Sequence, residues 1–208
     1  MRKSEVRSPE SGVPALEQTQ SPHPRTKKRG PRTSESGLRT LIIGYGNPLR
    51  SDDGFGWHVS RLLARELAGQ DAEVITCHQL TPELAESLSQ SRRAVFIDAD
   101  AEGDPGEIHC RTVEPQAPAF SGFTHSCSPS GLLASAQGLY GCRPQAVVIT
   151  VTAQSFAFGD SLSPVVSAAL PEVVDQVREI VSLPSFDAKA QDGSCKGICS
   201  GVRNTPLK

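Results

Sequence analysis

The stretch TLIIGYGNPLRSDDGFGWHVSRLLAREL (40–67) decides the fold class. Its first six residues form a short apolar run that ends at glycines, as a buried strand does. From Gly54 to Leu67 the spacing of Val59, Leu62, Leu63 and Leu67 is that of one helix face. Between the two lies the acidic loop Asp52-Asp53-Gly54. A strand, a tight loop and a helix in this order are typical of an α/β domain.

The alternation continues along the chain. Apolar runs at 73–76, 94–99 and 146–151 predict further strands, and helices are expected over 81–89, 129–139 and from Ser163 onward. The 81–89 helix is expected to begin with Thr81 as cap and Pro82 at the first helical position. The inner stripe expected for the last helix is Val165, Val166, Ala169, Val173, Val177 and Ile180. This order predicts a single α/β domain with a mostly parallel, twisted sheet of about five strands and helices on both faces. The segment 106–113 is expected to add an antiparallel strand.

Charge is divided unevenly among three regions of the chain. Residues 1–40 carry nine Lys or Arg against four Asp or Glu, whereas residues 41–183 carry eight against seventeen. We expect residues 1–38 to be a disordered basic tail, residues 39–183 the α/β domain, and residues 184–208 a flexible tail. An acidic domain argues against a nucleic-acid-binding face, which would need a basic patch.

Membrane attachment and secretion are also disfavoured. No apolar run approaches the ~18 residues that a membrane span needs, and the N-terminus lacks the layout of a secretory signal. The six cysteines are scattered through a chain of ordinary size rather than packed into a small scaffold. We therefore expect reduced thiols and a cytoplasmic location.

Three polar clusters are expected where ligands gather in open α/β sheets, beyond the carboxyl ends of the strands. The first is Asn47–Asp53, the second is Asp98 with Asp100, and the third is Thr124-His125-Ser126. Two carboxylates and an imidazole converging from separate loops would make a three-ligand metal site with open positions. Oxygen and nitrogen donors suit Zn²⁺ and Ni²⁺ alike.

Two other interpretations of the first loop remain open on the residues alone. Asp52 and Asp53 could cap the helix that follows them and favour its positive end. Gly44 and Gly46 invite a dinucleotide-binding interpretation, but that fingerprint needs a third glycine where Leu49 stands. The two carboxylates also oppose a pyrophosphate, so a nucleotide role is disfavoured.

Four blocks of sequence resemble the [NiFe]-hydrogenase maturation endopeptidases. They are GYGNPLRSDDGFG (44–56), FIDAD (96–100) with GDPGEI behind it, the TH of FTHSCSPSGLLASA (123–136), and FAFGDSLSPVVSAALPEVV (156–174). Their order and separation match the family, and together they cover roughly residues 40–182. The first block is specific, and the others are individually weak.

The resemblance implies an activity, a partner and a set of site residues. Such proteases remove a C-terminal extension from the precursor of the hydrogenase large subunit once nickel has been inserted. Carried over by position, the metal site comprises Asp53, Asp98 and His125, with Asp53 and Asp98 as candidate catalytic carboxylates. Asp52 is expected to cap the helix or to accept a hydrogen bond next to the metal ligands. A monomer suffices for docking to one precursor.

The resemblance leaves the mechanism and one rival function open. An ion held by the three residues could polarise the scissile carbonyl and activate a water. Alternatively the ion is the substrate's own nickel, and a carboxylate serves as general base. We favour the second, because it explains why cleavage waits for metal insertion, although zinc at the same site is possible. The rival function is a metal-sensing assembly chaperone that binds the same subunit without cutting it.

Overall fold

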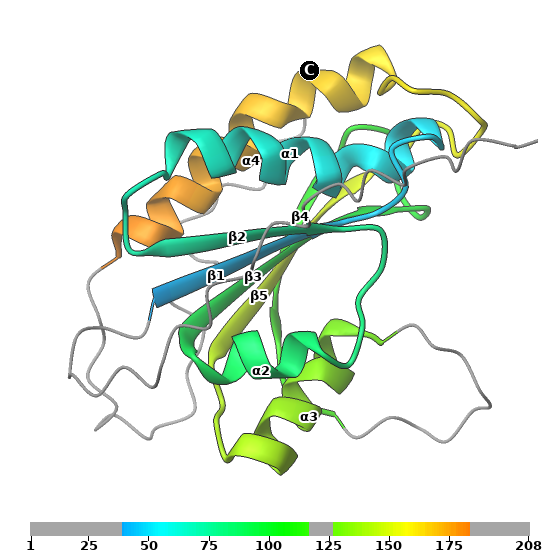
Figure 1. The fold of residues 1–208 in the computed structure, drawn as a ribbon. Coiled ribbons are helices and arrows are strands. Elements are labelled where there is room, and N and C mark those ends of the chain that lie inside the picture. The colour runs from blue at the N-terminus through cyan, green and yellow to red at the C-terminus, as the bar shows by residue number, and fades with distance from the viewer. Residues whose placement is uncertain (1–38, 117–126, 184–208) are drawn as a thin grey trace, which may run out of the picture. The chain divides into compact units, whose positions relative to one another are not determined.

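The structure, a computed structural model, describes residues 39–116 and 127–183 and consists there of a five-stranded sheet between two layers of helices (Figure 1). The strands are β1 (Arg39–Tyr45), β2 (Ala72–Cys77), β3 (Ser91–Asp100), β4 (Ile108–Val113) and β5 (Gln145–Thr152). Their order across the sheet is β2-β1-β3-β5-β4. All neighbours are parallel except β4, which pairs antiparallel with β5. The predicted fold class is confirmed, including the added antiparallel strand.

The helices divide between the two faces of the sheet. They are the 3₁₀ turn η1 (Ser51–Gly54), α1 (Phe55–Glu66), α2 (Leu84–Ser89), α3 (Pro129–Tyr140) and α4 (Pro164–Ser182). Helices α1 and α4 cover one face, and α2 and α3 cover the other (Figure 1). Among the described residues, no helix combines the length and the apolar character needed to cross a membrane.

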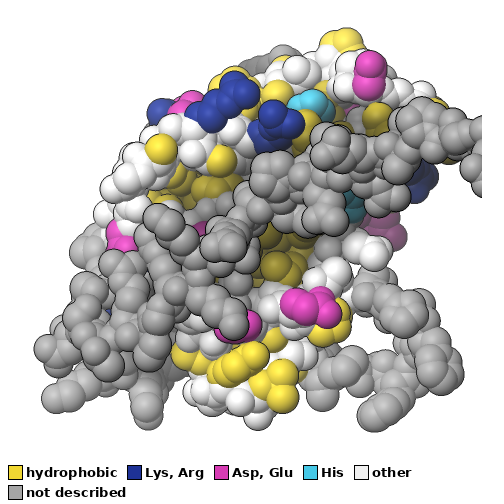
Figure 2. Space-filling view, in the orientation of Figure 1, with side chains coloured by type: hydrophobic (Ala, Val, Ile, Leu, Met, Phe, Trp, Pro, Cys, Tyr) yellow, Lys and Arg dark blue, Asp and Glu magenta, His cyan; other side chains and the backbone are white. Residues whose placement is uncertain are grey.

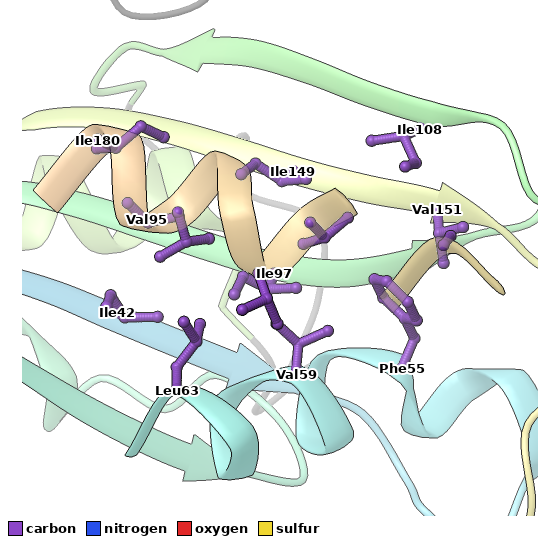
Figure 3. Packing of buried hydrophobic residues seen from close by; sticks show 14 of the residues in the cluster. Ile42, Phe55, Val59, Leu63, Val95, Ile97, Ile108, Ile149, Val151 and Ile180 are labelled. Atoms are coloured by element: carbon purple, nitrogen blue, oxygen red, sulfur yellow. The ribbon is translucent and has the colours of Figure 1, made fainter. Parts of the chain in front are cut away.

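Each face of the sheet buries its own apolar core. Along β3, Val95 and Ile97 point to the α1/α4 side, and the alternate residues Ala94 and Phe96 point to the α2/α3 side. This period of two is what a strand covered on both faces requires. Figure 3 shows the first core, in which Phe55, Val59 and Leu63 of α1 meet the strands.

Two local predictions were wrong in detail. The helix expected over 81–89 begins only at Leu84, because the amides of Leu84 and Ala85 bond to the carbonyls of Thr81 and Pro82 in turns ahead of it. Leu62, expected on the inner face of α1, is 39% exposed, whereas Phe55 is buried. In α4 the expected stripe is buried apart from Val165, which is only partly so.

The outer face of α1 is basic. Arg61 and Arg65 are exposed, and the Arg61 guanidinium lies 4.5 Å from the centroid of the Trp57 ring. Figure 2 shows Lys and Arg side chains, in dark blue, in the upper part of this view, where the α1/α4 layer lies. A helix with an apolar inner face and charged outer face is an ordinary amphipathic surface helix. The expected tails, 1–38 and 184–208, lie outside the described residues.

Candidate functional site

The acidic loop turns back on itself directly after β1. Gly46 has a φ of 128°, and a Cβ at this position would lie 1.8 Å from the carbonyl oxygen of Asp53. Only glycine tolerates both that backbone conformation and so close an approach. The Asp53 carboxylate accepts a hydrogen bond of 3.1 Å from the amide of Asn47. The turn therefore holds Asp53 at the carboxyl end of β1.

Asp52 is fully buried and bonds to a distant loop, the β5–α4 loop of residues 153–163. One carboxylate oxygen accepts from the amide of Ser163 at 2.7 Å. The other accepts at 2.9 Å from the amides of Gln154 and Ser155 and from the Ser163 hydroxyl. In the described chain, the N-termini of η1 and α1 have no side-chain cap. Asp52 thus joins the acidic loop to the segment that begins α4, and it does not cap the helix that follows it in sequence.

Backbone hydrogen bonds extend this junction. The Ser51 amide donates to the Gly159 carbonyl at 3.0 Å, and the Gly159 amide donates to the Leu49 carbonyl at 3.1 Å. The Ser51 hydroxyl donates to the carbonyl of Ala157 at 3.1 Å. Ser51 itself has a φ of 47°, a conformation that costs about 1–3 kcal/mol in a non-glycine residue and persists only where neighbours enforce it. The two loops therefore form one rigid unit around the acidic pair.

Asp98 lies where β3 reaches the same edge of the sheet. Its carboxylate accepts from the amide of Ala99 at 2.9 Å and from the Tyr45 hydroxyl. Burial raises the pKa of Asp98 to about 6, and the charges of Asp53 and Asp100 act in the same direction. The two hydrogen bonds oppose the rise in pKa without cancelling it. Asp98 and Asp53 therefore interact, as two carboxylates of a shared site would.

Strand register places further polar side chains beside Asp98. Tyr45 pairs with Cys77 of β2, Asp98 pairs with Thr150 of β5, and Thr150 pairs with His109 of β4. By strand alternation these residues face the α2/α3 side. Burial and the neighbouring Asp98 raise the pKa of Tyr45, so its hydroxyl stays a hydrogen-bond donor. Sequence reasoning missed Tyr45, because only the register of β1 against β3 reveals its partner.

The remaining predicted site residues are Asp100 and His125. Asp100 accepts from the amides of Ala101 and Glu102, at 2.8 and 3.4 Å, and so serves its own turn. His125 lies outside the described residues, with the rest of the third cluster. Within residues 39–116 and 127–183, no three His, Cys, Asp or Glu side chains are grouped to hold a metal. Of the predicted site residues, the structure places Asp53 and Asp98 at the same edge of the sheet, and both are oxygen donors of the kind that divalent ions accept.

The first glycine of the loop has a packing role. A Cβ on Gly44 would lie 2.0 Å from the carbonyl oxygen of Gly56 and 2.6 Å from the Cβ of Ser60. Gly44 thus lets α1 lie directly against β1. Close packing accounts for this glycine without a bound pyrophosphate, which weakens the nucleotide interpretation further.

Several solved structures similar to this chain are hydrogenase maturation proteases. A hydrogenase 2 maturation peptidase from Thaumarchaeota archaeon SCGC_AB-539-E09 shares 26% identity at a TM-score of 0.54, covering 70% of this chain and 99% of its own. The [NiFe] hydrogenase maturation protease HybD from Thermococcus kodakarensis shares 25% identity at a TM-score of 0.55, covering 69% of this chain and 99% of its own. The maturation protease HycI of the same organism shares 20% identity at a TM-score of 0.58, covering 72% of this chain and 96% of its own. No family model and no curated protein matches the chain.

The fold is that of an α/β protein with two carboxylates at the carboxyl edge of its sheet, and the maturation proteases among the solved structures share this fold. In its fold and in four blocks of sequence, the chain is similar to the [NiFe]-hydrogenase maturation endopeptidases.

Proposed function

We propose that this chain is the endopeptidase that removes the C-terminal extension of a nickel-loaded [NiFe]-hydrogenase large-subunit precursor. The observation that supports the proposal is the placement of Asp53 and Asp98 at one edge of the sheet, where the charge of Asp53 helps to raise the pKa of Asp98. The similar solved structures are themselves named as maturation proteases or peptidases. An endopeptidase needs an acid–base group beside its scissile bond, and this pair supplies one.

In the proposed reaction, the nickel of the precursor is part of the substrate. Asp53, Asp98 and His125 are the residues that would contact it, and zinc or another divalent ion could bind the same donors. Asp53 reaches less far than a glutamate would, by about one methylene, so the ion would lie close to the loop backbone.

Asp98 is the better candidate for general base. Its pKa of about 6 makes it largely ionised at neutral pH yet basic enough to accept a proton. It would take a proton from the water whose oxygen attacks the scissile carbonyl carbon, and return it to the amine that leaves as the C–N bond breaks. Tyr45, which bonds to Asp98, would hold the carboxylate in place.

The cysteine content of the chain bears on its location. The six cysteines are scattered through a chain of ordinary size, a pattern typical of reduced thiols in a cytoplasmic protein. We therefore place the activity in the cytoplasm, and we propose that a monomer docks one precursor.

The test is to incubate the full chain with nickel-loaded precursor and weigh the products. Wild type should release the C-terminal extension, whereas Asp98→Asn and His125→Ala should leave the precursor uncut while their circular dichroism spectra stay unchanged. The matched control is Asp104→Asn, which alters an exposed carboxylate in the loop after β3 and should cut normally. Precursor bound by wild type but unchanged in mass would instead favour the assembly chaperone.

A further inference from the structure

Two large apolar side chains are exposed beside the candidate site. Phe158 is 94% exposed and Leu49 is 62% exposed. They belong to the two loops that Asp52 joins, and each directly precedes one residue of the parallel β-bridge between Arg50 and Gly159. The fold gains little from either side chain, since neither is packed in a core.

The backbone under these side chains is held in place. The Leu49 carbonyl accepts from the Gly159 amide, next to Phe158, and the Leu49 amide donates to the Asn47 side chain at 3.0 Å. Ala157, on the other side of Phe158, accepts from the Ser51 hydroxyl. A surface fixed before binding loses less conformational freedom on association than a loose one.

The surroundings match the usual anatomy of a binding surface. The neighbouring residues Arg50 and Asp160 are exposed and charged, so the two apolar side chains are flanked by polar ones. Protein interfaces commonly place a few apolar anchors among surrounding polar residues, and the anchors account for most of the binding energy.

We propose that Leu49 and Phe158 form a docking surface, hereafter the apolar rim, for the folded large-subunit precursor. This inference rests on the proposed function. Leu49 lies four residues before Asp53 in the same loop, and Phe158 is tied to that loop through Gly159. Whatever precursor segment reaches Asp53 must therefore bring the surface around it against the apolar rim. That continuity with the site selects the precursor as the occupant over a second copy of this chain.

The experiment measures binding of nickel-loaded precursor by calorimetry, in an Asp98→Asn background that prevents turnover. Phe158→Ala and Leu49→Ala should each raise the dissociation constant by about tenfold or more, as loss of an interface anchor does. Leu139→Ala is the matched control, since Leu139 is 73% exposed at the end of α3, and it should bind within about twofold of the parent. Because all three side chains are exposed, folding should survive the changes.

Two results would overturn the apolar rim. One is equal affinity of the rim variants and the Leu139 control. The other is a wild-type dimer in sedimentation that Phe158→Ala dissociates while precursor affinity stays the same, which would assign the surface to self-association. A parallel cleavage assay with the unmutated site keeps the two proposals apart, because intact binding without cleavage would reject only the endopeptidase. Loss of affinity in the rim variants would then still support the docking surface.

Discussion

Asp52, which is fully buried, and Asp98, which is partly buried, meet the cost of burial in different ways. Asp52 is fully buried and accepts four hydrogen bonds, so each of its oxygens is satisfied. Asp98 accepts fewer bonds beside two other carboxylates, and its pKa rises to about 6. A buried charge with full partners serves structure, and one with incomplete partners is available for chemistry.

Asp98→Asn should stabilise the protein at neutral and alkaline pH. The pKa of Asp98 is raised from 3.8 to about 6 on folding, so its contribution is fully present below pH 4 and is lost as pH rises through 6. The shift corresponds to roughly 3 kcal/mol, and Asn removes that cost. Urea unfolding should therefore show the variant more stable at pH 8 by about 1–3 kcal/mol, and near parity at pH 4. A difference independent of pH would contradict this assignment.

Asp52→Asn should destabilise the protein despite its small change in size. The side-chain NH₂ of Asn would face backbone N–H donors that now bond to the Asp52 carboxylate. Buried amides of the β5–α4 loop would then have no acceptor. We expect a loss of about 3–5 kcal/mol in the free energy of unfolding, measured by urea denaturation. Asp160→Asn, an exposed change in the same loop, is the control and should cost less than about 0.5 kcal/mol.

At the scale of elements, the site depends on how tightly α1 approaches the sheet. A Cβ on Gly56 would lie 2.2 Å from the carbonyl oxygen of Ile97 and 2.5 Å from that of Tyr45, both in strands that end at the site. The first turn of α1 thus rests on the backbones of β1 and β3. This contact fixes Asp53, just before the helix, relative to Asp98, just after Ile97.

Gly56→Ala and Gly138→Ala should change stability in opposite directions. Both glycines lie within helices, where alanine is intrinsically favoured by about 1 kcal/mol. A Cβ on Gly138 of α3 meets nothing within 4 Å, so this variant should gain about 0.5–1 kcal/mol. At Gly56 the backbone clash should outweigh propensity and cost about 2 kcal/mol or more. Thermal unfolding of both variants measures the contrast, and a stabilised Gly56→Ala would refute the close contact.

At the scale of the whole molecule, the sheet brings distant residues to one edge. β1 and β3 are adjacent although α1, β2 and α2 separate them in sequence, so Asp53 and Asp98 lie at the same edge of the sheet. The β5–α4 loop returns to the same edge and bonds to the acidic loop. Binding at such an edge follows from parallel topology, because all parallel strands end there.

Chelation should distinguish the substrate's nickel from a resident ion. If the metal arrives with the precursor, enzyme treated with EDTA and then desalted should cut nickel-loaded precursor at the untreated rate, and nickel-free precursor should stay whole. The measurement is the mass of the precursor over time. Loss of activity after chelation, with recovery on adding zinc, would instead support a resident metal.

Much of the fold was accessible from local pattern. The apolar runs and helical spacings depend on near neighbours in sequence, which is why the strands, the antiparallel β4 and most of the α4 stripe were predicted. The errors at Leu62 and at the start of α2 arose where tertiary packing and turn hydrogen bonds override local periodicity. Asp53 and Asp98 could be proposed as partners because both follow strands of a parallel sheet.

The sequence by itself determined the strand–helix order and the carboxylates at the strand ends, since burial periodicity and chain punctuation are local. Only the tertiary structure decided what those carboxylates contact. The bonds of Asp52 to Ser163, of Tyr45 to Asp98, and of Leu49 to Gly159 join residues more than fifty positions apart. No local spacing encodes such pairs, because they arise when strand register and loop packing bring separate segments together.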